Sequence, residues 1–354
     1  MKSPIRLGII GLGSMGRHHV RNARATEGVA LVGLADPAGD VHNVAGGVPV
    51  FSEVSALIEA GIDAAILAAP TLYHEEIALK LAQAGVHTLV EKPLATDYAS
   101  GQRVAEAFAT RGLIGAVGYV ERCNPALLEM RRRIAEGQLG QVYQVSTRRQ
   151  SPFPARICDV GVVKDLATHD VDLASWVVGA PYESVYAQTT NRSGREHEDM
   201  VTVAGRLTNG ILVNHLVNWL SPYKDRTTIV IGENGALVAD TILGDLTFYE
   251  NGTQPLQWDQ VAAFRGVSEG AAIRYALTKR EPLAVEHEHF RDAIWGVGSE
   301  HVTMEEGQRA LAVVDAILQS ARSGQAVELS SITRTGDTAS TCEGPGGQML
   351  KTQG

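Results

Sequence analysis

The chain has 354 residues, of which 44% are hydrophobic and 20% are charged, and its formal net charge is −9 at pH 7. This composition is typical of a globular protein and excludes global disorder, while the length predicts more than one domain. The negative charge provides no electrostatic basis for binding nucleic acid or an anionic membrane, so we expect neither partner.

Cysteine use and apolar runs indicate the compartment. The three cysteines, Cys123, Cys158 and Cys342, are odd in number and widely spaced. They form neither a disulfide framework nor a zinc pattern, which favours a reducing environment. We recognise no secretory signal and no apolar run of about 20 residues, so we expect a cytoplasmic protein without a transmembrane helix.

Short apolar runs alternate with amphipathic, helix-like segments over residues 1–120. We expect strands at 5–10, 29–35, 48–51, 64–68, 87–90 and 113–118. Strands that alternate with helices predict a parallel sheet covered on both faces. Residues 1–120 are therefore predicted to form an α/β domain of the Rossmann type.

The pattern changes after residue 120. Asn124 suits the N-cap and Pro125 the first position of a helix, and further helices are expected at 162–178, 286–295 and 303–322. Strands are expected at 141–149, 183–191, 199–207, 211–219, 227–231, 235–240 and 245–250. Consecutive strands predict a large, mostly antiparallel sheet in an α+β substrate domain.

The second domain is assigned to residues 121–330, with the possibility that helix 303–322 packs back on the Rossmann domain. Residues 331–354 are rich in Ser, Thr and Gly and contain few large apolar side chains. They cannot bury enough surface to offset the cost of ordering, so we expect a flexible tail.

A glycine-rich segment directly follows the first strand and precedes a helix. Gly11 permits a tight turn, Gly13 lets the backbone approach a pyrophosphate, and Gly16 allows close packing of helix on strand. We expect Ser14 and Met15, at the start of the helix, to contact the same cofactor through its amide-rich N-terminus. The alternative is a glycine turn without a ligand.

Asp36 stands at the end of the second strand, about 20 residues beyond Gly16. A carboxylate there can accept hydrogen bonds from the adenosine ribose and repels a 2′-phosphate. The following Pro37-Ala38 offers no arginine for that phosphate, so NAD is favoured over NADP. The alternative is an ordinary solvated acid at a strand end.

Glu91-Lys92-Pro93 follows the fifth strand. Ligands of open α/β sheets bind beyond the carboxyl ends of the strands, so Lys92 is expected beside the nicotinamide. Glu91 and Lys92 point in opposite directions if the strand continues through them. The alternative is a solvated ion pair on a loop.

A polar stripe follows on the helix predicted at 162–178. Asp165 and His169 are four positions apart and share a face, which Asp172 and Trp176 continue. Oxidation of an alcohol requires removal of a hydride and of the hydroxyl proton, and histidine suits the second task near neutral pH. The alternative is a histidine satisfied in the core or at the surface.

Two metal-binding interpretations are set aside. His169, Asp170 and Asp172 could hold a divalent ion, but the sequence has no second ligand cluster, so no metal is expected. The string 286–289, Glu-His-Glu-His, lies at the start of a predicted amphipathic helix and is interpreted as a solvated face.

Together these residues give a chain that resembles the Gfo/Idh/MocA family of sugar and cyclitol oxidoreductases over about residues 4–329. The resemblance is carried by segments 11–16, 69–74, 91–93, 124–125 and 165–170. It implies that Lys92 is the catalytic lysine and that Asp165 and His169 form the accompanying pair. It also implies cofactor contacts from Pro70 and His74, although the family often has asparagine where this chain has leucine at position 72.

The same resemblance implies an open sheet used in a homodimer or homotetramer. Segments 118–125, 151–154 and 159–163 look most like the branch that oxidises UDP-linked N-acetylhexosamines at C3. We therefore expect NAD-dependent oxidation of a sugar hydroxyl to a keto-sugar, with Arg122, Asn124 and Asp172 binding the sugar. The alternatives are an inositol or free-sugar dehydrogenase and a non-catalytic regulator that senses NAD and sugar.

Overall fold

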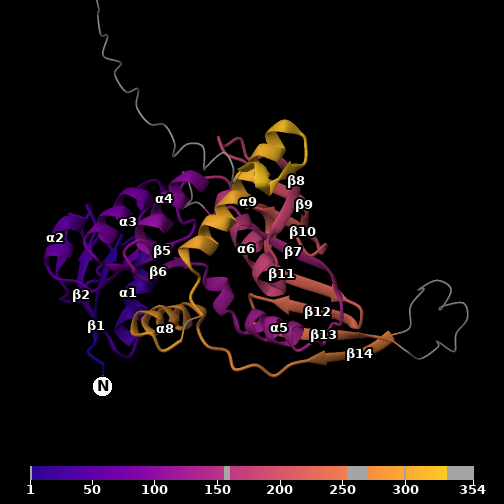
Figure 1. Ribbon diagram of the computed structural model, residues 1–354, viewed down its shortest axis with the longest axis horizontal. Helices are drawn as coiled ribbons and strands as arrows, with labels where there is room; N and C mark the ends of the chain where they lie inside the picture. Colours follow the sequence, from indigo (N-terminus) through magenta and orange to yellow (C-terminus); the bar gives the residue numbers. More distant parts are fainter. Residues whose placement is uncertain (1, 155–159, 253–268, 299, 333–354) are drawn as a thin grey trace, which may run out of the picture.

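The computed structural model describes residues 2–154, 160–252, 269–298 and 300–332. The tail expected at 331–354 lies outside the described residues from 333 onward, as do Cys158 and Cys342. Figure 1 shows two sheets side by side, each covered by helices. In the described part of the chain, every helix is too short or too polar to cross a membrane.

The first sheet is parallel throughout, in the order β3-β2-β1-β4-β5-β6. Its strands are β1 Ile5–Ile10, β2 Val29–Ala35, β3 Val50–Phe51, β4 Ala64–Leu67, β5 His87–Glu91 and β6 Gly115–Gly118. The helices between them are α1 Gly16–Ala25, α2 Val54–Glu59, α3 His74–Gln83 and α4 Tyr98–Ala109. The predicted Rossmann-type α/β fold is confirmed.

The second sheet runs β14-β13-β12-β11-β7-β10-β9-β8-β15 and is antiparallel except for the pair β7 and β10. Its strands are β7 Val142–Pro152, β8 Tyr182–Thr190, β9 Met200–Leu207, β10 Leu212–Asn218, β11 Leu220–Gly232, β12 Gly235–Asp240, β13 Asp245–Asn251, β14 Glu269–Arg274 and β15 Val327–Glu328. The predicted mostly antiparallel sheet is confirmed, whereas β14 and β15 were not predicted.

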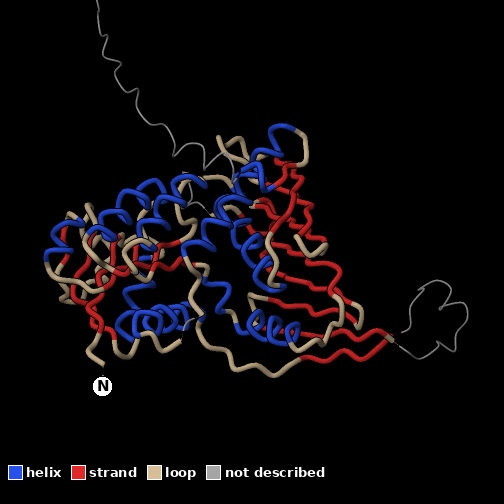
Figure 2. Tube along the Cα trace, viewed as in Figure 1, coloured by secondary structure: helices blue, strands red, loops and turns tan. Residues whose placement is uncertain are grey.

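Two helices cover one face of this sheet (Figure 2), namely α5 Pro125–Ala135 and α6 Thr168–Val178. The continuous α-helix predicted at 162–178 is wrong at its start, because Val163–Ala167 forms a π-helical turn before α6. Such turns are rare and are frequent at functional sites. Here the turn carries Asp165, so it changes the direction of that side chain relative to an ideal helix.

Two helices from the end of the chain return to the Rossmann domain. In α8, Pro282–Trp295, Phe290 is buried in the core around β1, and Trp295 lies against Gly28. In α9, Met304–Ser323, Leu311 packs in the Rossmann core and Ile317 in the core of the second domain. Figure 1 shows α8 beside α1, and α9 running between α4 and α6. The first half of α9 thus packs on the Rossmann domain, and its second half packs on the second domain.

Candidate active site

The glycine-rich turn joins β1 to α1 and leaves room for a ligand. Gly11 has φ +87°, and a Cβ there would meet the backbone of Ala68 at 2.7 Å. A Cβ on Gly16 would lie 1.9 Å from the carbonyl oxygen of Gly11. A Cβ on Gly13, by contrast, would meet no described atom within 4 Å. Two glycines are therefore required by the turn itself, and the third opens its outer side to a pyrophosphate.

Asp36 is tied to this turn. Its Oδ2 accepts a hydrogen bond from the backbone N–H of Leu12 at 2.7 Å, and its Oδ1 accepts one from Ala38 at 2.8 Å. Each carboxylate oxygen has a second lone pair, so the group can still accept hydrogen bonds from a ribose. The residues present thus fit NAD.

Pro70 lies on the loop after β4, and His74 is the first residue of α3. The ring of His74 is buried, with Nδ1 2.9 Å from the carbonyl oxygen of Pro93 and Nε2 2.8 Å from that of Ala69. Burial lowers the pKa of His74. Both ring nitrogens therefore face backbone carbonyls, which joins the loop at Pro70 to the segment after Lys92.

Lys92 lies at the carboxyl end of β5, directly before a cis peptide bond to Pro93. Its Nζ donates to Oδ1 of Asp165 at 2.9 Å and to the carbonyl oxygen of Asp165 at 2.8 Å. The Lys92 side chain is 16% exposed and that of Asp165 is 7% exposed. The other oxygen, Oδ2, is buried and contacts no hydrogen-bond partner in the described residues. Lys92 of the Rossmann domain is thus held by Asp165 of the second domain, and Oδ2 of Asp165 remains without a hydrogen-bond partner among the described residues.

His169 lies one turn beyond Asp165. The residue is half-buried, and its ring packs edge-on against Tyr119, with ring centroids 6.0 Å apart. Nδ1 is buried and has no hydrogen-bond partner among the described residues. Burial lowers the pKa of His169 well below its usual value, and the positive charge of Lys92 lowers it further. His169 is therefore neutral near neutral pH and can accept a proton.

A buried charge cluster that was not predicted from the sequence lies next to His169. Arg149, on β7, donates to Oδ2 of Asp170 at 2.9 Å and to Oε1 of Glu121 at 2.8 Å. Arg226, on β11, contacts the same oxygen of Glu121 at 3.2 Å. Both arginines also lower the pKa of His169. Arg149 lies in phase with Val145 and Thr147 on the buried face of the strand, and this inward position was the available signal.

Asp170 and Asp172, the alternative metal ligands, each pair with an arginine. Asp170 pairs with Arg149, as described above. Asp172 accepts two hydrogen bonds from Arg122, at 2.8 Å from Nε and 2.5 Å from Nη2. Arg122 also donates to Glu306 on α9 at 2.7 Å. Within the described residues, no group of three or more His, Cys, Asp or Glu side chains converges on a possible metal position.

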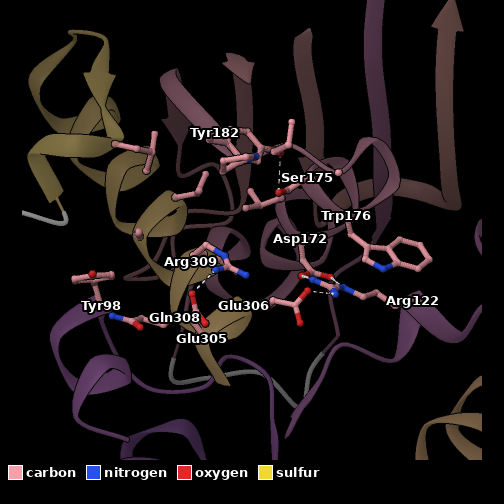
Figure 3. Close-up of a pocket in the computed structure, with 18 of the residues that line it drawn as sticks. Tyr98, Arg122, Asp172, Ser175, Trp176, Tyr182, Glu305, Glu306, Gln308 and Arg309 are labelled. Atoms are coloured by element: carbon pink, nitrogen blue, oxygen red, sulfur yellow. Dashed lines mark hydrogen bonds and ion pairs between the residues drawn. The ribbon is translucent and has the colours of Figure 1, made fainter. Parts of the chain in front are cut away.

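The predicted sugar contacts do not gather at Lys92. Arg122 and Asp172 line a separate cavity of about 560 Å³ between α6 and α9 (Figure 3). Lys92, Asp165 and His169 are absent from the described residues that line this cavity. Trp176, which continued the predicted stripe, lines it too and lies 5.6 Å from the Arg122 guanidinium. The predicted stripe is therefore divided: Asp165 contacts Lys92, whereas Asp172 and Trp176 line the separate cavity.

Asn124 has a structural role. Its Oδ1 accepts from the N–H of Ala126 at 3.1 Å, which confirms the predicted N-cap of α5. Its Nδ2 donates to the carbonyl oxygen of Thr241 at 2.9 Å. The side chain is buried and used on both sides, so the structure does not bring it to the Lys92 site.

The solvated face predicted at 286–289 is wrong for its first two residues. Glu286 is 7% exposed and His287 is 3% exposed. The helix begins at Pro282, and this part of it faces α1, where Nε2 of His287 lies 2.9 Å from Nδ1 of His19. The prediction failed because the partner on α1 is remote in the sequence.

Two segments of the chain match known protein families. Residues 5–119 match the oxidoreductase-family profile described as an NAD-binding Rossmann fold. Residues 127–238 match the GFO/IDH/MocA C-terminal domain.

Two curated relatives and one solved structure are similar to this chain. UDP-N-acetylglucosamine 3-dehydrogenase of Acidithiobacillus ferrooxidans is 30% identical over 82% of this chain and 88% of that protein. Inositol 2-dehydrogenase 2 of Saccharopolyspora erythraea is 34% identical, but the match spans 59% of this chain and 65% of that protein. The WlbA dehydrogenase from Bordetella pertussis, solved with NADH and UDP-GlcNAcA, has a TM-score of 0.75 at 26% identity, covering 92% of this chain and 98% of that chain.

Proposed function

Since the chain belongs to the Gfo/Idh/MocA family of oxidoreductases, we propose that it uses NAD to oxidise the C3 hydroxyl of UDP-N-acetylglucosamine to a ketone. The observation that carries the chemistry is the cross-domain contact of Lys92 with Asp165 beside the neutral ring of His169. The contact lies at the carboxyl end of β5, where open α/β sheets bind ligands.

NAD, when bound, accepts the hydride that leaves the sugar carbon. The turn around Gly13 and the carboxylate of Asp36 are the groups that would hold it, and Asp36 disfavours the 2′-phosphate of NADP. Pro70, His74 and Glu91 complete the proposed cofactor site, His74 through the two carbonyls that it joins and Glu91 through the Lys92 peptide.

The proton is handled by Lys92 and His169. The Lys92 ammonium donates a hydrogen bond to the sugar hydroxyl oxygen and stabilises negative charge as the O–H bond breaks. Neutral His169 accepts the hydroxyl proton, for which its unpartnered nitrogen is available. Asp165 orients the ammonium through its Oδ1 and its backbone carbonyl. Hydride and proton thus leave together, and a ketone remains.

The UDP-sugar is favoured over other alcohols by two similarities. The relative that matches over 82% of the chain is a UDP-N-acetylglucosamine 3-dehydrogenase, and the Bordetella structure holds a UDP-linked sugar acid. A second candidate is oxidation of inositol, which is favoured by the 34% identity to inositol 2-dehydrogenase 2. Both candidates use the same Lys92 and His169 chemistry, so only the substrate distinguishes them.

The proposal includes assembly into a homodimer or homotetramer through the second sheet. Tyr186, Leu212, Ile231 and Tyr249 lie on four strands of that sheet and are each at least 39% exposed. The residue that precedes each of them in the sequence is buried, so these side chains share the outer face. Such an apolar face is typical of an interface. As part of the same proposal we place the enzyme in the cytoplasm, because its few cysteines provide no disulfide framework.

The experiment is to mix purified protein with NAD and one compound at a time: UDP-N-acetylglucosamine, its uronic acid, myo-inositol or glucose. Absorbance of reduced nicotinamide with the UDP-sugars alone is the expected result. A signal with inositol alone would establish the second candidate instead. NAD binding without turnover of any compound would contradict both and favour the non-catalytic regulator.

A further inference from the structure

A buried series of hydrogen bonds connects β5, the strand that ends beside Lys92, to helices α1 and α8. Oε1 of Glu91 lies 2.9 Å from Nε2 of His19, and Nδ1 of His19 lies 2.9 Å from Nε2 of His287. All three residues are buried, and none is more than 6% exposed. They come from β5, α1 and α8. These hydrogen bonds therefore join the strand that ends beside Lys92 to the helix that follows the glycine-rich turn, and that helix to α8.

The carboxylate of Glu91 is the acceptor at one end. Burial alone would raise its pKa, but the contacts with His19 and Lys92 together lower the pKa more, so Glu91 is ionised. Its second oxygen, Oε2, accepts from the backbone N–H of Lys92 at 3.1 Å. Both carboxylate oxygens are thus engaged, one with α1 and one with the peptide that carries Lys92.

His287 closes the other end. Burial lowers the pKa of His287 well below its usual value, so its ring is neutral, and its Nε2 shares one hydrogen bond with Nδ1 of His19. Glu286, its neighbour, has a pKa raised well above the usual range by burial and by the charge of Glu91. Glu286 is therefore neutral, and its buried Oε2 has no hydrogen-bond partner in the described residues. Glu91 carries the negative charge that organises the chain.

We propose that His19 and His287 are positioning residues that hold the cofactor-binding helix α1 and the Lys92 peptide in register through Glu91. Neither histidine touches the reacting atoms in this account. Because α8 comes after β14 of the second sheet in the sequence, these hydrogen bonds also make the cofactor site depend on a helix remote from the Rossmann strands in the sequence. The inference rests on the proposed function in taking Lys92 as catalytic.

The test compares His287→Leu, which removes the hydrogen bond, with His287→Gln, whose amide can replace Nε2 as donor or acceptor. Glu286→Gln is the matched control, because it changes a buried neighbour on the same helix that is already neutral. Glu91→Gln keeps the volume but places an amide nitrogen against one of two donors. The dissociation constant for NADH is measured by fluorescence without substrate, followed by kcat and KM for the sugar and by the melting temperature.

We expect His287→Leu and Glu91→Gln to weaken NADH binding about tenfold, the scale of one broken buried hydrogen bond. The kcat at saturating NAD should also fall, while KM for the sugar changes by less than about twofold. His287→Gln and Glu286→Gln should stay within about twofold of the wild type.

Wild-type NADH affinity in both His287→Leu and Glu91→Gln would overturn the inference, as would a His287→Gln variant as defective as His287→Leu. If His287→Leu does not fold, the contrast between Glu91→Gln and Glu286→Gln decides. NADH binding is measured without substrate. Failure to oxidise any sugar would therefore contradict the proposed function, whereas the NADH dissociation constants of the variants would still test this inference.

Discussion

The Nζ of Lys92 lies 2.9 Å from Oδ1 of Asp165, although 73 positions separate the two residues in the sequence. Lys92 directly follows β5 of the Rossmann sheet, and Asp165 lies in a π-helical turn of the second domain. One ion pair therefore joins the proposed cofactor and substrate sides at the point where a hydride must cross.

Replacement of His169 by alanine removes the proposed proton acceptor. We expect kcat to fall by roughly 10²–10⁴-fold, the scale of general acid–base catalysis, with NADH affinity little changed. Steady-state kinetics and an NADH titration check both parts. Turnover close to that of the wild type would exclude His169 as the base.

Lys92→Met keeps the aliphatic stem and removes the ammonium. We expect kcat to fall about 10²-fold or more, because the hydroxyl oxygen loses its charged donor. Lys164→Met is the matched control, since Lys164 is adjacent to Asp165 but donates to the carbonyl oxygen of Thr96. Equal losses in the two variants would show that the effect is general and not tied to Lys92.

Asp36→Ala tests the cofactor preference. We expect the dissociation constant for NAD to rise about tenfold, because the ribose loses its acceptor. NADP should bind better than to the wild type, because the carboxylate no longer repels the 2′-phosphate. Calorimetric titrations with both cofactors measure the two changes. An unchanged ratio of NAD to NADP affinity would show that Asp36 does not select the cofactor.

The pair Arg122 and Asp172 is expected to stabilise the fold, not to bind sugar. Arg122→Met leaves Asp172 buried without its partner and should cost about 3–5 kcal/mol of unfolding free energy. The double variant Arg122→Met with Asp172→Leu should recover most of that loss. Urea unfolding measures both. A stable Arg122→Met protein with a raised KM for the sugar would restore the role that the sequence suggested.

His215 should make the protein less stable in acid. Burial lowers the pKa of His215 from 6.5 to about 4 in the fold. Between these values the unfolded chain binds the proton and the folded chain does not, so unfolding free energy falls as pH falls, by about 3 kcal/mol in all. His215→Gln should lessen this slope, whereas substitution of the exposed His42 should not. Urea titrations from pH 7 to pH 4 decide; parallel slopes for wild type and His215→Gln would contradict the assignment.

The strands and the phosphate-binding turn could be predicted because local sequence determines them. The apolar run of β1 and the conformational needs of Gly11 and Gly16 lie within a few residues of one another. The N-cap at Asn124 was readable for the same reason. At these places propensity, pattern and packing agree, which is where sequence reasoning is strongest.

The partners of buried charges could not be predicted in this way. Arg122 and Asp172 looked like ligand contacts, because a polar residue on an apolar face has the same pattern whether it meets a ligand or an ion-pair partner. His287 looked solvated because His19, 268 positions away, meets it only after α8 folds back. The π-helical turn at Asp165 likewise depends on packing that helical periodicity does not reveal.

The most direct test of the central claim is to supply UDP-N-acetylglucosamine deuterated at C3 together with NAD, and to analyse the nicotinamide product by mass spectrometry. The account predicts deuterium in the reduced nicotinamide, with a slower rate for the labelled sugar and loss of the product in His169→Ala. Reduced nicotinamide without deuterium would place the oxidation at another carbon, and its absence would contradict oxidation of this sugar altogether.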